Sequence, residues 1–381
     1  MKKAFLSAAA VIVFMLFLPV SALCSDASQQ NERDYSADIA ENSGAYEVFE
    51  GLDNETKELL ESLGMDDYSV ASMLDIGPRQ IITLIIDMST GKAAKPFATA
   101  AVIMGIVLMM SLCDTLMPKL ASSAGSVNIV FMLMIALAFL APVTESVVNT
   151  VSAVKLECDF TLTLAPVLAA LIASSGNPAL AFSYSSLAVG AAEVFMGISS
   201  SFLVPVVSAY FAVCVAAGIN PIFNIQNSAM FLKKLFTVAS GLVAAVFTGL
   251  LSFKSLLSKS ADSVAVKGVK FLIGGLVPVV GGAMSEGLSA VTGAVKSVSA
   301  AVGFAGVAAL AVMFIPAACE MLLWWAALWL CSMAATLIGQ SSVSFFISGL
   351  SNVVVMMNIL LCLCTFILIC TTGVVVAVGS M

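Results

Sequence analysis

Three carboxylates lie within or between long apolar runs, where an ionised group is most costly. Glu193 is flanked by apolar residues on both sides, Glu286 lies in a glycine-rich stretch, and Glu320 stands at the joint between two apolar runs. In hydrocarbon each must face protein, water or a helix end. Such acids contact protons or solutes in membrane proteins, or they supply polarity to packing, and both roles stay open for all three. Glu193 is the best candidate for a buried acid.

A second candidate region is the run GGLVPVVGGAMSEG within residues 271–290. Paired glycines weaken a helix and let backbones approach closely, and proline removes a backbone donor. We therefore expect a broken or re-entrant element here, buried in the bundle. Its candidate functional or packing residues are Pro278, Gly281, Gly282 and Glu286.

The sequence contains no histidine, which excludes imidazole bases, Ser-His nucleophile pairs and most zinc sites. Among the nine cysteines, Cys158 is expected in a polar loop. Cys362 and Cys364 lie in an apolar run and are typical of small hydrophobic filler. We therefore expect no catalytic, cofactor-binding or metal-binding residues, and no enzymatic activity.

The elements that hold these residues are too apolar for water. From Ala98 to Met381 there are 17 charged residues, and from Met321 to Met381 there are none. A water-soluble domain needs charge on its outside, so this surface must face lipid. Helices are the open-ended structures that satisfy their own backbone in lipid. The predicted fold is all-α, a polytopic membrane bundle over residues 96–381.

Eight apolar runs in this domain are long enough to cross a bilayer, and we expect six to eight crossings. The runs are 97–116, 127–150, 160–190, 200–218, 235–253, 298–318, 321–337 and 350–378. Small and turn-forming residues at 173–178 predict a tight turn that closes a hairpin.

The N-terminus has a basic start, an apolar core from Ala4 to Val20 and small residues after it. This pattern is typical of a secretory signal peptide, here residues 1–24. An uncleaved first span is the alternative, because the apolar core is borderline in length for crossing. Both interpretations place Ser25 and the residues after it outside the cytoplasm.

Residues 25–95 form an acidic extracytoplasmic segment with short helices. Between Ser25 and Phe97 there are 15 acids and five bases. Asp53 or Asn54 is placed to cap one of the helices. About 70 residues in short helices form a marginal core alone, so we expect this segment to pack on the membrane body or on a partner.

The order of these parts, together with the run KFLIGGLVPVVGGAMSEGLSAVTGA from Lys270, resembles the stage III sporulation protein AE family. The run APVLAALIASSG from Ala165 is similar to that family's earlier segment with proline and glycine. The likeness covers most of the chain, and residues 270–293 carry its specific part. No catalytic residues are carried over.

The resemblance implies a membrane subunit of an endospore-forming bacterium. Such proteins build a channel or secretion-like complex between mother cell and forespore, which maintains the forespore and its late gene expression. The implied partners are other membrane and ring-forming subunits, a cytoplasmic ATPase companion and a forespore-side partner. The chain would lie in the mother-cell membrane around the forespore, with its N-terminal segment in the intermembrane space.

A second interpretation is an autonomous secondary transporter that couples protons or solute through Glu193 or Glu286. Composition alone does not separate it from a subunit of a complex. A subunit would lose its activity without its partners, whereas a transporter would act alone in liposomes. Nucleic-acid binding has no support, because no basic patch with interleaved aromatic residues is present.

Overall fold

The computed structural model describes residues 44–62, 78–116, 124–219, 227–250 and 281–379. Within these ranges the chain is helical and contains no strand. Six helical stretches there are long and apolar enough to cross a membrane, so the chain is a multi-pass membrane protein. The expected all-α polytopic fold is confirmed.

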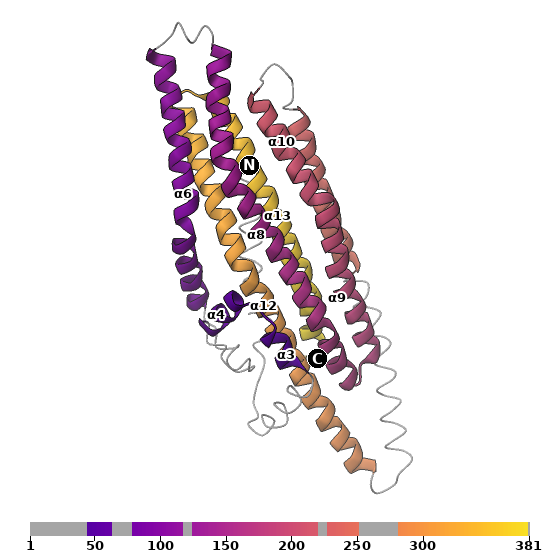
Figure 1. The fold of residues 1–381 in the computed structure, drawn as a ribbon. Helices are drawn as coiled ribbons and strands as arrows, with labels where there is room; N and C mark the ends of the chain where they lie inside the picture. Colours follow the sequence, from indigo (N-terminus) through magenta and orange to yellow (C-terminus); the bar gives the residue numbers. More distant parts are fainter. Residues whose placement is uncertain (1–43, 63–77, 117–123, 220–226, 251–280, 380–381) are drawn as a thin grey trace.

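Two short helices open the described part, and six longer helices and one short π-helical turn follow them (Figure 1). They are α3 (Ala45–Glu50), α4 (Asn54–Ser62), α6 (Pro78–Leu116), α8 (Ala124–Ser174), α9 (Pro178–Ile198), the π-helical turn η1 (Ser199–Leu203), α10 (Val204–Ile219), α12 (Gly281–Leu337) and α13 (Ser341–Gly379). A further helix covers Asn227–Leu250. Because α9, η1 and α10 follow one another without a gap, they form one candidate span, Pro178–Ala217.

Helices α12 and α13 form the centre of the bundle and pack on each other (Figure 1). The most apolar windows of these two helices are 72% buried, whereas those of the other four spans are at most 33% buried. Helix α6 packs on α8 and α12, while α9 and α10 pack on α13. The charge-free C-terminal part of the sequence is therefore the core of the protein rather than its lipid-facing surface.

Hydropathy predicts two breaks between membrane spans where the structure has continuous helices. Helix α8 continues without a break through residues 151–159, which separate two of the expected spans. Helix α12 likewise continues through Pro316 and Glu320, so the runs 298–318 and 321–337 belong to one helix. A polar residue does not end a helix when its side chain finds a partner or water, and neighbouring helices make a proline tolerable.

The predicted hairpin turn is present between α8 and α9. Gly176 has a φ of 87°, a left-handed conformation that glycine adopts without strain. The Asn177 side chain donates a hydrogen bond to the Ser175 hydroxyl at 3.1 Å, and Pro178 begins α9, where its missing N–H costs nothing. Helices α8 and α9 are thus antiparallel neighbours.

The described part of the acidic segment packs on the bundle, one of the two expected outcomes. The Asp53 carboxylate caps α4, accepting hydrogen bonds from the Thr56 backbone N–H at 3.2 Å and from its hydroxyl at 2.5 Å. This confirms Asp53 as the cap. Helix α3 contacts α8, and α4 contacts α12. The long helix α6 then begins at Pro78 and passes Lys95 without interruption.

Candidate functional site

One acid lies in the core of the bundle. Among the described residues, Glu157 is the only Asp, Glu, Lys or Arg that is fully buried, with 0% of its surface exposed. It extends from α8 towards α13, where the Thr365 hydroxyl lies 2.9 and 3.0 Å from its two oxygens. The same hydroxyl lies 3.0 Å from the Leu361 carbonyl oxygen. Because a hydroxyl carries one proton, it donates to one of these acceptors at a time.

Thiols lie beside Glu157. The sulfur atoms of Cys158 on α8 and Cys364 on α13 are 3.8 Å apart, and both residues are fully buried. Neither of the two ion pairs in the described part of the chain includes Glu157. The carboxyl group is therefore held by neutral groups. Such a group is suited to exchanging a proton, or to fixing the register of two packed helices.

Sequence reasoning missed Glu157, although a signal was present. Lys155, Glu157 and Asp159 follow one another at every second position. On a helix the first and third of these lie on one face, and the middle one lies on the opposite face. Lys155 and Asp159 are exposed in the structure and Glu157 is buried. Assigning residues 151–159 to a loop removed this clue, and it also placed Cys158 wrongly in a polar loop.

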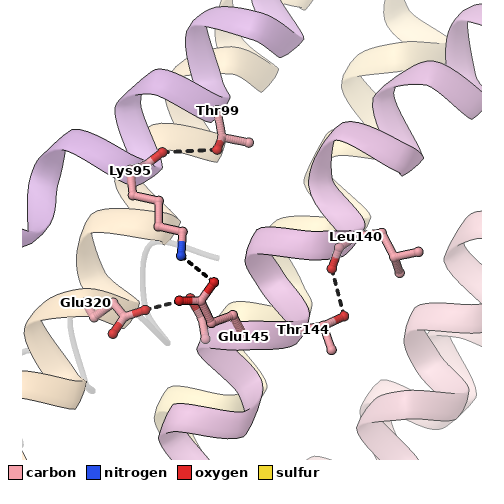
Figure 2. Close-up of polar contacts among 7 residues, drawn as sticks. Lys95, Thr99, Leu140, Thr144, Glu145 and Glu320 are labelled. Atoms are coloured by element: carbon pink, nitrogen blue, oxygen red, sulfur yellow. Dashed lines mark hydrogen bonds and ion pairs between the residues drawn. The ribbon is translucent and has the colours of Figure 1, made fainter.

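A second polar group, the polar belt, consists of Lys95, Glu145, Ser146 and Glu320. Lys95 of α6 forms an ion pair with Glu145 of α8, and the Ser146 hydroxyl donates a hydrogen bond to Glu320 of α12 at 2.6 Å. Figure 2 shows Lys95, Glu145 and Glu320 converging from three helices. The belt ties α6, α8 and α12 together at one height. Glu320, expected at a joint, is thus a packing contact within a continuous helix.

We expect Ser146→Ala to lower the free energy of unfolding by about 1–3 kcal/mol, because Glu320 would lose its partner at a half-buried position. Thr144→Ala is the matched control. The Thr144 hydroxyl is exposed and bonds the Leu140 carbonyl of its own helix (Figure 2), so we expect a change below about 0.5 kcal/mol. Thermal unfolding of both variants in detergent measures the difference. Equal melting temperatures would show that the bond to Glu320 adds no stability.

The expectation that Glu193 is a buried acid is wrong, because its side chain is exposed on α9. The buried side of this helix is formed by Ala188, Ala192 and Phe195. Glu193 lies away from that face, since each residue turns by about 100° along a helix. Apolar neighbours in sequence show that a residue belongs to an apolar helix, but they do not show which face it occupies.

The glycine-rich candidates fall partly outside the described residues. Pro278 and the rest of 271–280 lie outside them, so the expected broken element stays a prediction. Gly281, Gly282 and Glu286 lie in the first turns of α12. This end of α12 extends past the other helices in Figure 1. The structure does not bring these residues to Glu157 or to the polar belt.

A half-buried lysine, Lys233, also bonds to a core helix of the bundle. Lys233 lies two turns into the helix Asn227–Leu250, and its Nζ donates a hydrogen bond to the Asn352 side-chain oxygen of α13 at 2.6 Å. The buried Tyr210 and Cys214 of α10 lie beside this pair. The sequence alone gives Lys233 no special status, since it stands just before an apolar run.

The described residues hold no group of three or more His, Cys, Asp or Glu that is arranged to bind a metal ion. Three polar sites inside the bundle are Glu157 with its hydroxyl and thiol neighbours, the polar belt, and the Lys233–Asn352 pair. Each of them joins helices that are far apart in sequence. Of the three, Glu157 is the strongest candidate for chemistry, because it is a buried acid with no charged partner.

No curated protein sequence and no solved structure matches this chain. The family model of stage III sporulation protein AE matches residues 69–379. That match includes all of the long helices and the glycine-rich run that carried the resemblance. The chain therefore belongs to the stage III sporulation protein AE family.

Proposed function

We propose that this protein is a membrane subunit of a channel or secretion-like complex that links mother cell and forespore. In this role it would be needed for forespore maintenance and for late forespore gene expression. The observation that carries the proposal is the family match over residues 69–379, which includes the whole multi-pass bundle.

The same proposal assigns the location and the partners. The chain lies in the mother-cell membrane around the forespore, with its N-terminal acidic segment in the intermembrane space. Its partners are other membrane and ring-forming subunits, a cytoplasmic ATPase companion and a forespore-side partner. The outward face of α4 carries Glu55, Glu58 and Glu61, which supports a water-filled compartment on that side of the membrane.

Purification of the tagged chain from crosslinked sporulating cells tests this proposal. We expect membrane subunits, ring-forming subunits and the ATPase companion to co-purify with it, and a deletion strain to form engulfed forespores that fail to mature. An unrelated tagged multi-pass protein expressed from the same promoter is the control. If the tagged chain purifies alone, or if the deletion strain yields wild-type numbers of spores, the proposal is wrong.

A secondary transporter is the second candidate function, because Glu157 is a buried acid without a cationic partner. In this hypothesis the coupling acid is Glu157 and not Glu193, because the Glu193 side chain is exposed. The purified wild-type chain in liposomes tests this function through a pH-sensitive dye trapped inside. Proton movement by the chain alone, lost in Glu157→Gln, would favour the transporter. If neither the wild-type chain nor Glu157→Gln moves protons across the liposome membrane, the result favours the subunit.

A further inference from the structure

The exposed face of α8 changes its chemistry at Glu145. Before this residue the helix exposes large apolar side chains, namely Val130, Leu133, Met134, Leu137 and Leu140. After it the helix exposes Asn149, Ser152, Lys155, Asp159 and Thr163, and its large exposed apolar residues are Val148 and Leu156. One continuous helix thus passes from a surface suited to lipid to a surface suited to water.

The apolar part of the bundle has the thickness of a bilayer. Lys95 and Asp114 of α6 are 19 residues apart, and Ala124 and Glu145 of α8 are 21 apart. At about 1.5 Å per residue these stretches are about 29 and 32 Å long, and a hydrocarbon core is about 30 Å thick. Neither stretch has a charged residue inside its limits.

Polar contacts mark both limits. At one side the polar belt joins α6, α8 and α12 (Figure 2). At the other, the Gln340 side chain donates a hydrogen bond to Asp114 at 2.7 Å, beyond the end of α12 at Leu337. Between Glu320 and Leu337 this helix also carries no charge. Three helices therefore share one charge-free layer between two polar levels.

Beyond the belt, acidic helices cover the bundle. Phe49 of α3 packs on Phe160 of α8, with ring centroids 6.1 Å apart, well past Glu145. Helix α4 packs on α12 and exposes Glu55, Glu58 and Glu61 on its outer side. Hydrocarbon cannot surround three exposed acids on one short helix. This height of the bundle therefore lies in water.

The position of the exposed Glu193 agrees with a division of the bundle into a part that faces lipid and a part that faces water. Glu193 on α9 and Asp159 on α8 are both 17 residues from Gly176 in the antiparallel hairpin, so they lie at about the same height. Lys155 is exposed one turn away. Three exposed charged residues thus occur at one level outside the charge-free layer. The apolar α12 and α13 need no lipid at this level, because neighbouring helices bury them.

We infer that the bilayer surrounds only the part of the bundle between the polar belt and the Asp114–Gln340 contact. The other part, from the belt to the α8–α9 turn, stands in water on the side of α3 and α4. From Glu145 to Ser174 it extends for about 44 Å. The apolar faces of α6 and of the first half of α8 are the surface that binds lipid chains. This placement does not depend on the proposed function.

The placement also assigns parts of the remaining spans to the layer. Val207 on α10 and Glu145 on α8 are both 31 residues from Gly176, so α10 enters the layer near Val207. The helix Asn227–Leu250 bonds Asn352 of α13 through Lys233, 12 residues after Gln340 and inside the layer. Inside the layer lie α6 from Lys95 to Asp114, the first half of α8, the end of α12 and the start of α13, together with α10 from Val207 to its end at Ile219, about 18 Å.

Reaction with a charged maleimide tests the placement in the full-length chain. The purified protein is reconstituted in phosphatidylethanolamine–phosphatidylglycerol vesicles, which are opened by freezing and thawing so that both faces are reachable. Asn149→Cys, Ser152→Cys and Thr163→Cys report on the part assigned to water. Val130→Cys, Met134→Cys and Leu137→Cys report on the part assigned to lipid. All six positions are exposed, so the variants should fold.

We expect the first three cysteines to react at least tenfold faster than the last three, and all six to react alike in hot detergent. The wild-type chain gives the background from the native cysteines. Slow reaction at Asn149→Cys, Ser152→Cys and Thr163→Cys would place that half in lipid and overturn the inference. Rapid reaction at the three positions before Glu145 would overturn it equally.

Discussion

Cells whose only copy of this protein carries Glu157→Lys are expected to accumulate almost no folded protein, and their spore yield should fall with it. Glu157 is 0% exposed and packs between α8 and α13 against Thr365. A lysine there would bury an ammonium group with no acid to pair with. Leaving such a charge unpaired costs about 3–5 kcal/mol, a large share of a typical total stability of about 5–15 kcal/mol.

Glu193→Lys is the matched control for this experiment. It makes the same charge reversal on the neighbouring helix, at an exposed position. We expect a change below about 0.5 kcal/mol and normal spore numbers. The measurements are thermal unfolding of the detergent-solubilised proteins and spore counts. Similar melting temperatures for the two variants would mean that Glu157 is not buried in the folded protein.

The conservative variant Glu157→Gln separates a structural role from a chemical one. Glutamine has the shape of glutamate, and its oxygen can still accept a hydrogen bond from Thr365. If Glu157 sets helix register, this variant should fold and support sporulation. If Glu157 exchanges protons, the variant should fold and lose function, because an amide cannot take up a proton at working pH.

Composition and hydropathy were sufficient to predict the class of fold. Lipid leaves few ways to satisfy a backbone, so a long run with few charges must be helical. Local chemistry also predicted the turn at Gly176 and the cap at Asp53, since both depend on neighbours in sequence. The family resemblance rested on a longer run of specific residues, and the family match confirmed it.

The candidate site was harder to predict, because it depends on which face of a helix each residue occupies. Hydropathy averages over all faces, so it ended a span at residues 151–159 and made Glu193 look buried. In the structure Lys155 and Asp159 face outward, Glu157 faces α13, and the helix does not break. The partners of Glu157 and Glu320 are more than 170 positions away in the chain, and no local pattern identifies them.

Gly306→Leu is expected to be the second most disruptive change. Gly306 lies where α12 meets both α8 and α13. A Cβ atom there would stand 2.4 Å from Leu164 Cδ2 and 3.5 Å from Thr372 Cγ2. A leucine would displace the Leu164 side chain within this buried contact, and overpacking of this kind costs about 1–3 kcal/mol. We therefore expect a lower melting temperature and fewer spores.

A control variant and a rescue variant test whether the clash at Gly306 is the cause. Gly105→Leu adds the same side chain to α6 at an exposed position with no heavy atom within 4 Å, so it should leave stability unchanged. Leu164→Ala in the Gly306→Leu background removes the atoms that clash. We expect the double variant to melt above Gly306→Leu alone, although Leu164→Ala by itself should destabilise the wild type. Additive losses in the double variant would show that α8 and α12 do not meet at Gly306.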